Sequence, residues 1–182
     1  VLDFKPDFVI NATGANPLKP KSIIGIDKPN VSSATDVLQG KSYIGNEIAI
    51  IGAGLVGAET AVVLAQKGKK VTLIEMANKV LPEPVFIQNA MMLNALLKHP
   101  NITVKTSTKL VSIEDKSITL DCNGNIENIN CDNVVLAMGF KPNIDLYNEL
   151  KDLVPIANIG DSVSARKVLD AIHEAYEAVA AI

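Results

Sequence analysis

The segment Gly52-Ala53-Gly54-Leu55-Val56-Gly57 constrains the fold of this chain more than any other feature. It is a G-x-G-x-x-G turn that follows a continuous apolar run at 48–51 and leads into an Ala- and Leu-rich segment over 56–67, which Gly68 ends. Alone the pattern is weak, but a buried strand before it and a helix after it supply the context that gives it meaning. The sequence therefore predicts a βα unit of a parallel α/β sheet at this point.

Each glycine of the turn has its own part in binding a nucleotide diphosphate. Gly52 permits the tight turn off the strand, Gly54 lets the backbone approach a pyrophosphate, and Gly57 lets the helix pack close to the strand. The helix N-terminus adds unpaired N–H groups and partial positive charge. We therefore predict that 52–57 binds the pyrophosphate of a dinucleotide; the alternative is a glycine-rich turn that binds nothing.

An acidic residue, Glu75, ends the next predicted strand, over 71–75. A carboxylate there can accept hydrogen bonds from both ribose hydroxyls of an adenosine and would repel a 2′-phosphate. No arginine follows Glu75 closely, which favours NADH over NADPH, although Lys79 is close enough in sequence to weaken that preference.

The rest of the chain alternates helix and strand patterns and contains one antiparallel region. We predict strands at 7–10, 102–105, 134–138 and 156–159, helices at 33–38, 85–98, 146–150 and 164–181, and an antiparallel meander over 109–132. Ser32 or Ser33 is the expected cap of the first of these helices. The apolar stripes predicted to be buried are Phe86, Ala90, Leu93 and Leu97 in the 85–98 helix, and Val168, Leu169, Ile172, Tyr176 and Val179 in the last helix. Met91 and Met92 are also predicted to be packed.

Composition excludes several functional classes. The net charge is −3 and no basic stripe is present, so neither nucleic acid nor an anionic membrane is an expected partner. The longest apolar runs are too short to span a bilayer, and no signal peptide is expected. Cys122 and Cys131 fit neither a redox C-x-x-C pair nor a zinc site, so we expect reduced thiols in a cytoplasmic protein without a metal.

Three flanking segments give the turn a functional context. They are Asn-Ala-Thr-Gly-Ala at 11–15, Ala-Met-Gly-Phe-Lys-Pro-Asn at 137–143 and Ile-Gly-Asp at 159–161. In this order, and over nearly the whole chain, they resemble the two-dinucleotide-domain flavoproteins, in which an inserted NAD(P) domain splits an FAD domain in sequence. The segment 160–176 looks like the C-terminus of the NADH:flavin oxidoreductase group that contains 2,4-dienoyl-CoA reductase, enoate reductase and trimethylamine dehydrogenase.

The resemblance implies both a fold and a division of the chain. The expected fold is an α/β three-layer FAD/NAD(P)-binding Rossmann-like fold, with a parallel sheet, an antiparallel β-meander and an incomplete second, FAD-type lobe. Residues 1–44 would belong to the FAD-type domain, 45–138 would form the NADH-binding domain, and 139–182 would return to the FAD-type domain. Family members also carry an FMN barrel and an iron–sulfur cluster. Because these and the first FAD-binding G-x-G-x-x-G are absent from the sequence, we expect a fragment that requires the remaining domains of a longer enzyme.

The resemblance also implies roles for single residues. Thr13 and Gly14 would lie near the flavin nucleotide, Gly139 near bound NADH, and Gly160 with Asp161 near the ribityl or pyrophosphate region of FAD. For Gly14 and Gly139 the alternative is a simple turn.

Two further candidates and one departure from the family complete the site. Glu59 would lie toward the nicotinamide end, or else be a helix residue that faces a polar gap. Arg166 and Lys167 are predicted in the first turn of the last helix, where each cation opposes the helix dipole by roughly 0.3–1 kcal/mol. An anion such as a phosphate or a reduced flavin would offset this cost and makes Arg166 a cofactor-binding candidate; two solvated cations are the alternative. Asn11 stands where the family usually has a small or apolar residue.

The function predicted from these features is the pyridine-nucleotide-binding part of a flavin-dependent oxidoreductase that passes a hydride from NADH to FAD. The protein would supply positioning and electrostatics, so no catalytic side chain is predicted. In the complete family member electrons would continue to FMN and to an unsaturated enoate or enoyl substrate. One alternative is a stand-alone NAD-binding or regulatory module, which would not need Gly160-Asp161 and its helix. Another is an ordinary NAD-dependent dehydrogenase, for which no His, Lys or Tyr constellation is found.

Overall fold

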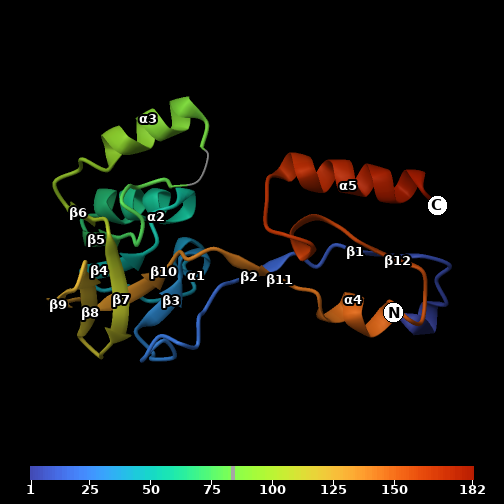
Figure 1. Cartoon of the computed structure of the whole chain (residues 1–182), viewed down its shortest axis with the longest axis horizontal. Helices are drawn as coiled ribbons and strands as arrows, with labels where there is room; N and C mark the ends of the chain where they lie inside the picture. The colour runs from blue at the N-terminus through green and yellow to red at the C-terminus, as the bar shows by residue number, and fades with distance from the viewer. Residues whose placement is uncertain (83–84) are drawn as a thin grey trace. The chain divides into compact units, whose positions relative to one another are not determined.

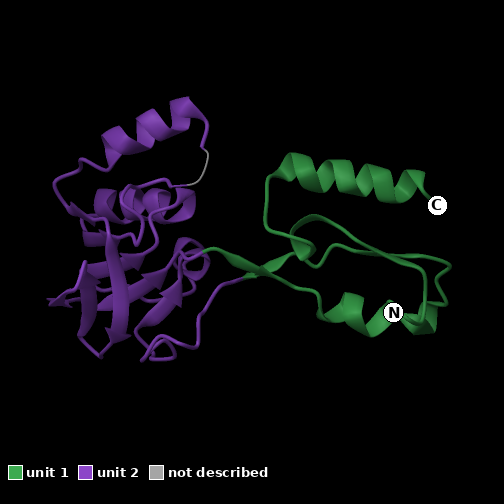
Figure 2. Ribbon diagram, viewed as in Figure 1, with its two compact units in different colours: residues 1–16, 139–182 green, residues 17–138 purple. Residues whose placement is uncertain are grey.

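A computed structural model describes residues 1–82 and 85–182 of the chain. The chain forms two compact units, one from 1–16 together with 139–182 and the other from 17–138 (Figure 2). The chain re-enters the first unit at Gly139, and the assignment of the two units to an FAD-type and an NADH-binding domain stays a prediction. Residues 17–44, which the sequence grouped with the first unit, instead lie in the second, because β3 (Val31–Ser33) pairs with a strand of its sheet.

The 17–138 unit is built around a five-stranded parallel sheet in the order β3–β10–β4–β5–β6 (Figure 1). Its other strands are β4 (Glu47–Ile51), β5 (Lys70–Ile74), β6 (Ile102–Lys105) and β10 (Asn133–Leu136). The chain proceeds from β4 through β5 to β6 and then places β10 on the opposite side of β4. The carboxyl ends of β4 and β10 therefore flank the topological switch point, where such sheets bind ligands.

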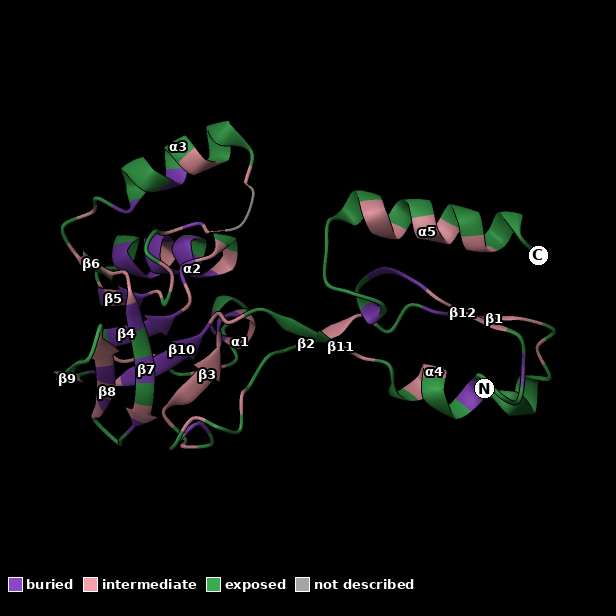
Figure 3. Ribbon diagram, viewed as in Figure 1, coloured by how far each residue is buried: buried purple, intermediate pink, exposed green. Residues whose placement is uncertain are grey.

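Helices cover one face of this sheet and an antiparallel meander covers the other. The covering elements are α1 (Ala34–Leu38), α2 (Leu55–Gln66), α3 (Ile87–Leu96), β7 (Thr108–Ile113), β8 (Ser117–Cys122) and β9 (Asn125–Asn130). Side chains of β4 alternate between the two hydrophobic clusters: Ile48 and Ile50 pack with the helices, and Ala49 and Ile51 pack with the meander. Figure 3 shows β10 buried along its whole length. The predicted three-layer α/β fold with a parallel sheet and a meander is thus confirmed.

The segment that leads into β3 is tied to the meander. Ile24 forms a β-bridge with Ser112, and Ile26 is buried in the cluster under the meander. Between them Gly25 has a φ of +82°, and a Cβ there would lie 2.0 Å from the carbonyl oxygen of Ile113. Glycine is therefore required at this position for both its conformation and its close approach.

Asp132 holds the beginning of β4 in place. Its Oδ2 accepts the backbone N–H groups of Glu47 at 3.0 Å and Asn46 at 2.8 Å, and its Oδ1 pairs with Lys116 at 3.2 Å. The two backbone donors, and then Lys116, lower the pKa of Asp132 from 3.8 to about 2.

The unit formed by 1–16 and 139–182 brings together segments that are distant in sequence. Its two-stranded sheet pairs β1 (Val9–Asn11) with β12 (Ile156–Asn158) in parallel. A second pair joins β2 (Ala15–Pro17) to β11 (Phe140–Pro142), the two segments by which the chain leaves and re-enters this unit. The remaining elements are η1 (Leu2–Phe4), α4 (Asp145–Leu150), η2 (Gly160–Ser162) and α5 (Val168–Ala180).

The last helix differs from its prediction. It begins at Val168, with Lys167 as its N-cap, so Arg166 and Lys167 precede the helix rather than forming its first turn. Helix α5 has no buried residue (Figure 3). The predicted buried stripe is 58% to 77% exposed in Val168, Leu169, Ile172, Tyr176 and Val179. Half-buried positions lie on another face of the helix, at Ala171, Glu174, Ala175 and Ala178. Periodicity identified the apolar stripe correctly, but it carries no information about what covers that stripe.

Helix α3 shows the same limit. Leu93 and Leu97 are buried and Ala90 packs against their cluster, as predicted, whereas Phe86 is exposed. Met91 and Met92 are exposed as well, so their predicted packing is wrong within the described chain. Among residues 1–82 and 85–182, no helix has the length and apolar character needed to cross a bilayer.

Candidate dinucleotide site

Two glycines of the G-x-G-x-x-G turn are required by the turn itself. Gly52 has a φ of +100°, and a Cβ there would lie 2.4 Å from the carbonyl oxygen of Ala137. A Cβ at Gly57 would lie 1.9 Å from the carbonyl oxygen of Gly52. Any side chain at either position would collide with backbone, which agrees with the roles expected for a tight turn and for close packing of α2 on β4.

Gly54 differs from both. Its φ of −68° is available to any residue, and a Cβ there would meet nothing within 4 Å. Neither conformation nor packing among the described residues therefore requires glycine at this position. What a side chain would occupy is open space at the N-terminus of α2, where a pyrophosphate could approach the backbone.

The same end of α2 presents hydrogen-bond donors. Ala58 makes the first helical hydrogen bond, to the carbonyl oxygen of Gly54 at 2.9 Å. The N–H groups of Leu55, Val56 and Gly57 precede it and have no acceptor in the part of the chain that the structure describes. Together with the helix dipole, they can bind an anion.

Glu75 follows β5 directly and lies beside the turn. Its Oε2 accepts the N–H of Ala53 at 2.7 Å, and its Oε1 accepts the N–H of Ala77 at 2.8 Å. These bonds fix the carboxylate at the end of β5, the strand next to β4, which leads into the glycine turn. Each carboxylate oxygen can still accept another donor. The carboxylate therefore lies beside the glycine turn, and its contact with ribose hydroxyls stays a prediction.

Leu81 also supports the turn, and the sequence analysis did not identify it. Its N–H donates to the carbonyl oxygen of Ala53 at 2.8 Å, its side chain is buried, and its φ is +51°. The left-handed conformation costs a leucine about 1–2 kcal/mol, so packing must hold it there. Ala53 is thus bonded through its N–H to Glu75 and through its carbonyl group to Leu81. No sequence signal marks a leucine for a positive φ.

A cavity of about 310 Å³ lies near the carboxyl ends of β3 and β10. Its lining includes Leu18, Val31, Ser32, Ser33, Asp36 and Leu136. Ser33 caps α1, as predicted, by accepting the N–H of Asp36 at 3.0 Å, and its hydroxyl donates to the Asp36 carboxylate at 2.7 Å.

Glu59 is exposed on α2, four residues after Leu55 and on the same side of the helix.

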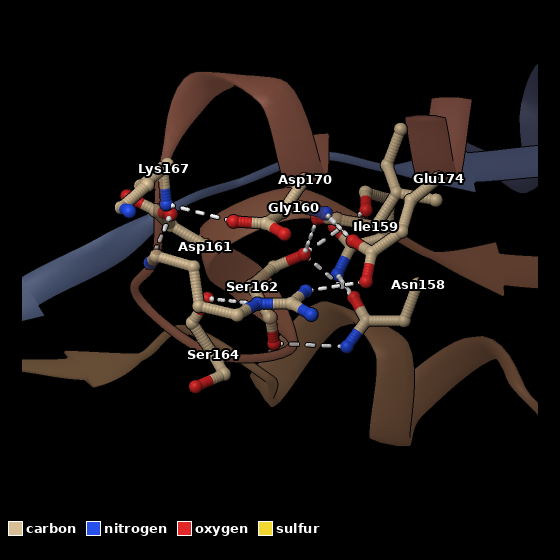
Figure 4. A network of polar contacts seen from close by, with 11 residues as sticks. Asn158, Ile159, Gly160, Asp161, Ser162, Ser164, Lys167, Asp170 and Glu174 are labelled. Atoms are coloured by element: carbon tan, nitrogen blue, oxygen red, sulfur yellow. Dashed lines mark hydrogen bonds and ion pairs between the residues drawn. The ribbon is translucent and has the colours of Figure 1, made fainter. Parts of the chain in front are cut away.

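The predicted flavin-side residues lie in the other unit, and hydrogen bonds join Gly160, Asp161 and Arg166 in one polar network. Figure 4 shows this network, with Gly160, Asp161 and Glu174 labelled. Gly160 has a φ of +64°, and its N–H donates to Oε2 of Glu174 at 2.7 Å. Oδ1 of Asp161 accepts the N–H of Arg166 at 3.2 Å. The Arg166 guanidinium donates to the carbonyl oxygen of Ser164 at 3.2 Å and pairs with Oε1 of Glu174.

Arg166 thus has an anionic partner within the chain, Glu174. The sequence analysis had considered only a bound anion of a ligand or a solvated cation. Arg166 first, and then the Gly160 N–H, lower the pKa of Glu174, while the bond to Glu174 raises the pKa of Arg166. The sequence did not identify Glu174 as a member of the site.

Asn11 is 1% exposed and belongs to a buried polar cluster. Its Nδ2 donates to Oδ1 of Asn158 at 2.7 Å. The hydroxyl of Ser162 lies 3.1 Å from the Asn11 carbonyl oxygen and 2.8 Å from Oδ1 of Asn158. The polar residue at position 11 is therefore structural, because it joins β1, β12 and η2.

Thr13, Gly14 and Gly139 lie where the two connecting segments pair. The hydroxyl of Thr13 donates to the carbonyl oxygen of Asn143, whose N–H donates to the Gly14 carbonyl oxygen, both at 2.9 Å. Gly14 and Gly139 have φ values of +74° and +94°, so the backbone alone requires glycine at both positions. Their roles beside a nucleotide stay predictions.

Across 1–82 and 85–182, no group of three or more His, Cys, Asp or Glu residues could hold a metal ion.

The sequence of this site matches a known family. The family model "Pyridine nucleotide-disulphide oxidoreductase" matches residues 3–160. The chain belongs to this family. Cinnamate reductase of Clostridium sporogenes is 40% identical over 180 residues, which cover 97% of this chain and 27% of that protein. NADH oxidase of Thermoanaerobacter brockii is 35% identical over 182 residues, with 94% and 27% covered.

Solved structures of the family agree with this assignment. A 2-naphthoyl-CoA reductase complex superposes with a TM-score of 0.85 at 31% identity and covers 94% of this chain and 26% of that structure. The resemblance to flavin-dependent reductases of the 2,4-dienoyl-CoA reductase group is thereby confirmed. The chain spans about a quarter of the length of these relatives.

Proposed function

We propose that this chain is the pyridine-nucleotide-binding part of a flavin-dependent oxidoreductase in which a hydride passes from NADH to FAD. The observation that carries the proposal concerns the described residues: none of them fills the space at Gly54 or accepts the N–H groups beside it, and an anchored carboxylate lies next to the turn. The family match and the names of the relatives, which include reductases and an NADH oxidase, support it.

In this proposal the 17–138 unit binds NADH. The N–H groups at the start of α2 bind the pyrophosphate, Glu75 binds the adenosine ribose, and Glu59 lies toward the nicotinamide. The role of Gly139 beside NADH stays a prediction, because Gly139 is the first residue of the other unit. A 2′-phosphate beside Glu75 would be repelled, so NADH is preferred over NADPH.

The unit of 1–16 and 139–182 is the FAD-type portion in this proposal, with Thr13, Gly14, Gly160, Asp161 and Arg166 toward the flavin nucleotide. Asp161 is exposed, and its Oδ2 has no donor in the described chain, so it can accept a ligand hydroxyl. FAD, when bound, supplies the group that accepts the hydride; the residues of this chain bind and orient both nucleotides.

The proposal extends to the complete protein, which we expect in the cytoplasm. Electrons would pass on through an iron–sulfur cluster and FMN to an unsaturated enoate or enoyl substrate. The names cinnamate reductase and 2-naphthoyl-CoA reductase, both of which describe reduction of unsaturated acids or thioesters, support this substrate class.

Calorimetric titration of this chain with NADH and NADPH tests the nucleotide site. We expect weak binding, with NADH the tighter ligand and no turnover. Glu75→Gln should weaken NADH binding about tenfold and reduce the preference over NADPH, because an uncharged amide binds hydroxyls less strongly and repels phosphate less. Glu47→Gln is the matched control. Glu47 begins β4, at the end of the strand away from the glycine turn, so this variant should bind NADH as the parent does. Tighter binding of NADPH than NADH would overturn the role of Glu75, and no binding of either would overturn the proposal.

A further inference from the structure

Glu174 connects helix α5 to both ends of the turn formed by residues 160–167 (Figure 4). One carboxylate oxygen accepts the Gly160 N–H at 2.7 Å, and the other binds the guanidinium of Arg166. The side chains of Glu174 and Arg166 are only 25% and 37% exposed, so the pair is partly shielded from solvent. Such charge-assisted bonds are stronger than neutral ones and specify geometry.

A second contact joins the helix to the turn. A Cβ at Gly160 would lie 3.3 Å from Cβ of Ala171, which leaves little room for a larger residue. Ala171 and Glu174 are one helical turn apart and lie on the same face of α5. The position of Gly160 is therefore set by α5 through packing at Ala171 and through a hydrogen bond at Glu174.

The pairing with Glu174 also determines which carboxylate the guanidinium of Arg166 binds. Asp161 and Asp170 both lie close enough to Arg166 to contribute electrostatically to its raised pKa. Within residues 1–82 and 85–182, Asp161 accepts the backbone N–H of Arg166 alone, while the guanidinium is bound to Glu174. Without a carboxylate at 174, the guanidinium would be free to pair with Asp161 instead and would occupy the oxygens that a ligand hydroxyl needs.

We propose that Glu174 is a positioning residue of the flavin-nucleotide site. It acts through Arg166, whose guanidinium it keeps away from Asp161, and through the N–H of Gly160, which it holds in place. This inference rests on the proposed function, because it assigns Glu174 to the FAD-type portion of that site.

The test uses the complete protein that contains this chain, stripped of flavin and titrated with FAD while flavin fluorescence quenching is followed. Glu174→Gln keeps an acceptor for the Gly160 N–H but removes the charge that binds Arg166. We expect FAD to bind about tenfold more weakly to this variant, with an altered visible circular dichroism of the bound flavin. Glu177→Gln, an exposed carboxylate on the same helix, is the matched control and should bind FAD as the parent does.

A double-mutant cycle separates positioning from general damage. If Glu174 acts through Arg166, Glu174→Gln should add no further loss of FAD affinity in an Arg166→Gln background. Arg166→Lys, which leaves α5 unchanged, should also weaken FAD binding because lysine lacks the planar fork of arginine. Unchanged FAD affinity in Glu174→Gln, or an equal loss in both backgrounds, would overturn the inference. A parent protein that binds NADH but never FAD would instead refute the flavin part of the proposed function, and the inference with it.

Discussion

Replacing Gly54 by alanine should separate nucleotide binding from protein stability. The three glycines of the turn differ in what surrounds them, so the same substitution has different consequences at each. At Gly54 a methyl group would enter open space, whereas at Gly57 it would lie 1.9 Å from a backbone oxygen. We expect Gly54→Ala to lose affinity for NADH and keep its fold, and Gly57→Ala to lose stability.

The magnitudes follow from the local geometry. At Gly54, alanine reduces the entropy of the unfolded chain, which stabilises by about 0.4–1 kcal/mol. As the N-cap of α2 it is a poorer residue than glycine by a similar amount, so the free energy of unfolding should change by less than about 1 kcal/mol. At Gly57 the backbone must move to relieve the collision, and we expect a loss of about 2 kcal/mol or more.

For Gly54→Ala, the expected loss of NADH affinity is larger than the expected change in the free energy of unfolding. If the proposed function holds, a methyl group at Gly54 would keep the NADH pyrophosphate away from the N–H groups of Leu55 and Val56. Hydrogen bonds to a charged group are worth about 1.5–3 kcal/mol each, so losing one corresponds to at least a tenfold rise in the Kd for NADH.

Two measurements on the same samples decide the matter: calorimetric titration with NADH, and urea unfolding followed by circular dichroism. NADH binding to Gly54→Ala as tight as to the parent would refute the reasoning, because the open space would then not be the pyrophosphate site. An equal loss of stability in Gly54→Ala and Gly57→Ala would refute it as well.

Two further predictions concern the 17–138 unit. Gly25→Ala should lower the free energy of unfolding in urea by about 2 kcal/mol or more, because its Cβ would lie 2.0 Å from the Ile113 carbonyl oxygen at a positive φ; Gly124→Ala, also at a positive φ but with nothing within 4 Å, should cost less, and equal losses would contradict the close-contact explanation. The Asp132 carboxylate, with a pKa lowered from 3.8 to about 2, should stabilise the fold fully above pH 4 and lose that contribution as the pH falls from 4 toward 2. Asp132→Asn should therefore be less stable than the parent at pH 7 and show a shallower fall in stability between pH 4 and 2, whereas a parallel pH profile would contradict the assignment.

The features predicted correctly from sequence depend on short stretches of chain. The strand, the glycine turn and α2 are continuous in sequence, and the location of Glu75 directly after β5 follows from that strand alone. The meander was recognisable from alternating residues between turn signals, such as Asn123-Gly124 between β8 and β9. In each case local conformation and burial are coupled over a few residues.

The features that sequence did not predict depend on distant partners. Residues 17–44 join the inserted unit because β3 pairs with β10, about a hundred residues later. The side-chain amide of Asn11 donates to Asn158, 147 positions away, and its buried Oδ1 has no hydrogen-bond partner in the described chain. The partner of Arg166 is Glu174, eight positions later. To predict this pair, one must know where α5 begins and which face of α5 lies toward residues 160–167. Hydrophobic periodicity supplies neither fact.

The pairing of β2 with β11 has a consequence for how such a protein can change. Because β2 and β11 pair with each other, the chain leaves the first unit and returns to it through two adjacent strands. Strands β1 and β12 pair with each other, Val9 beside Ile156, in a sheet that includes no strand of the 17–138 unit among the described residues. Recombination could therefore exchange the whole 17–138 segment while β1 and β12 keep their pairing.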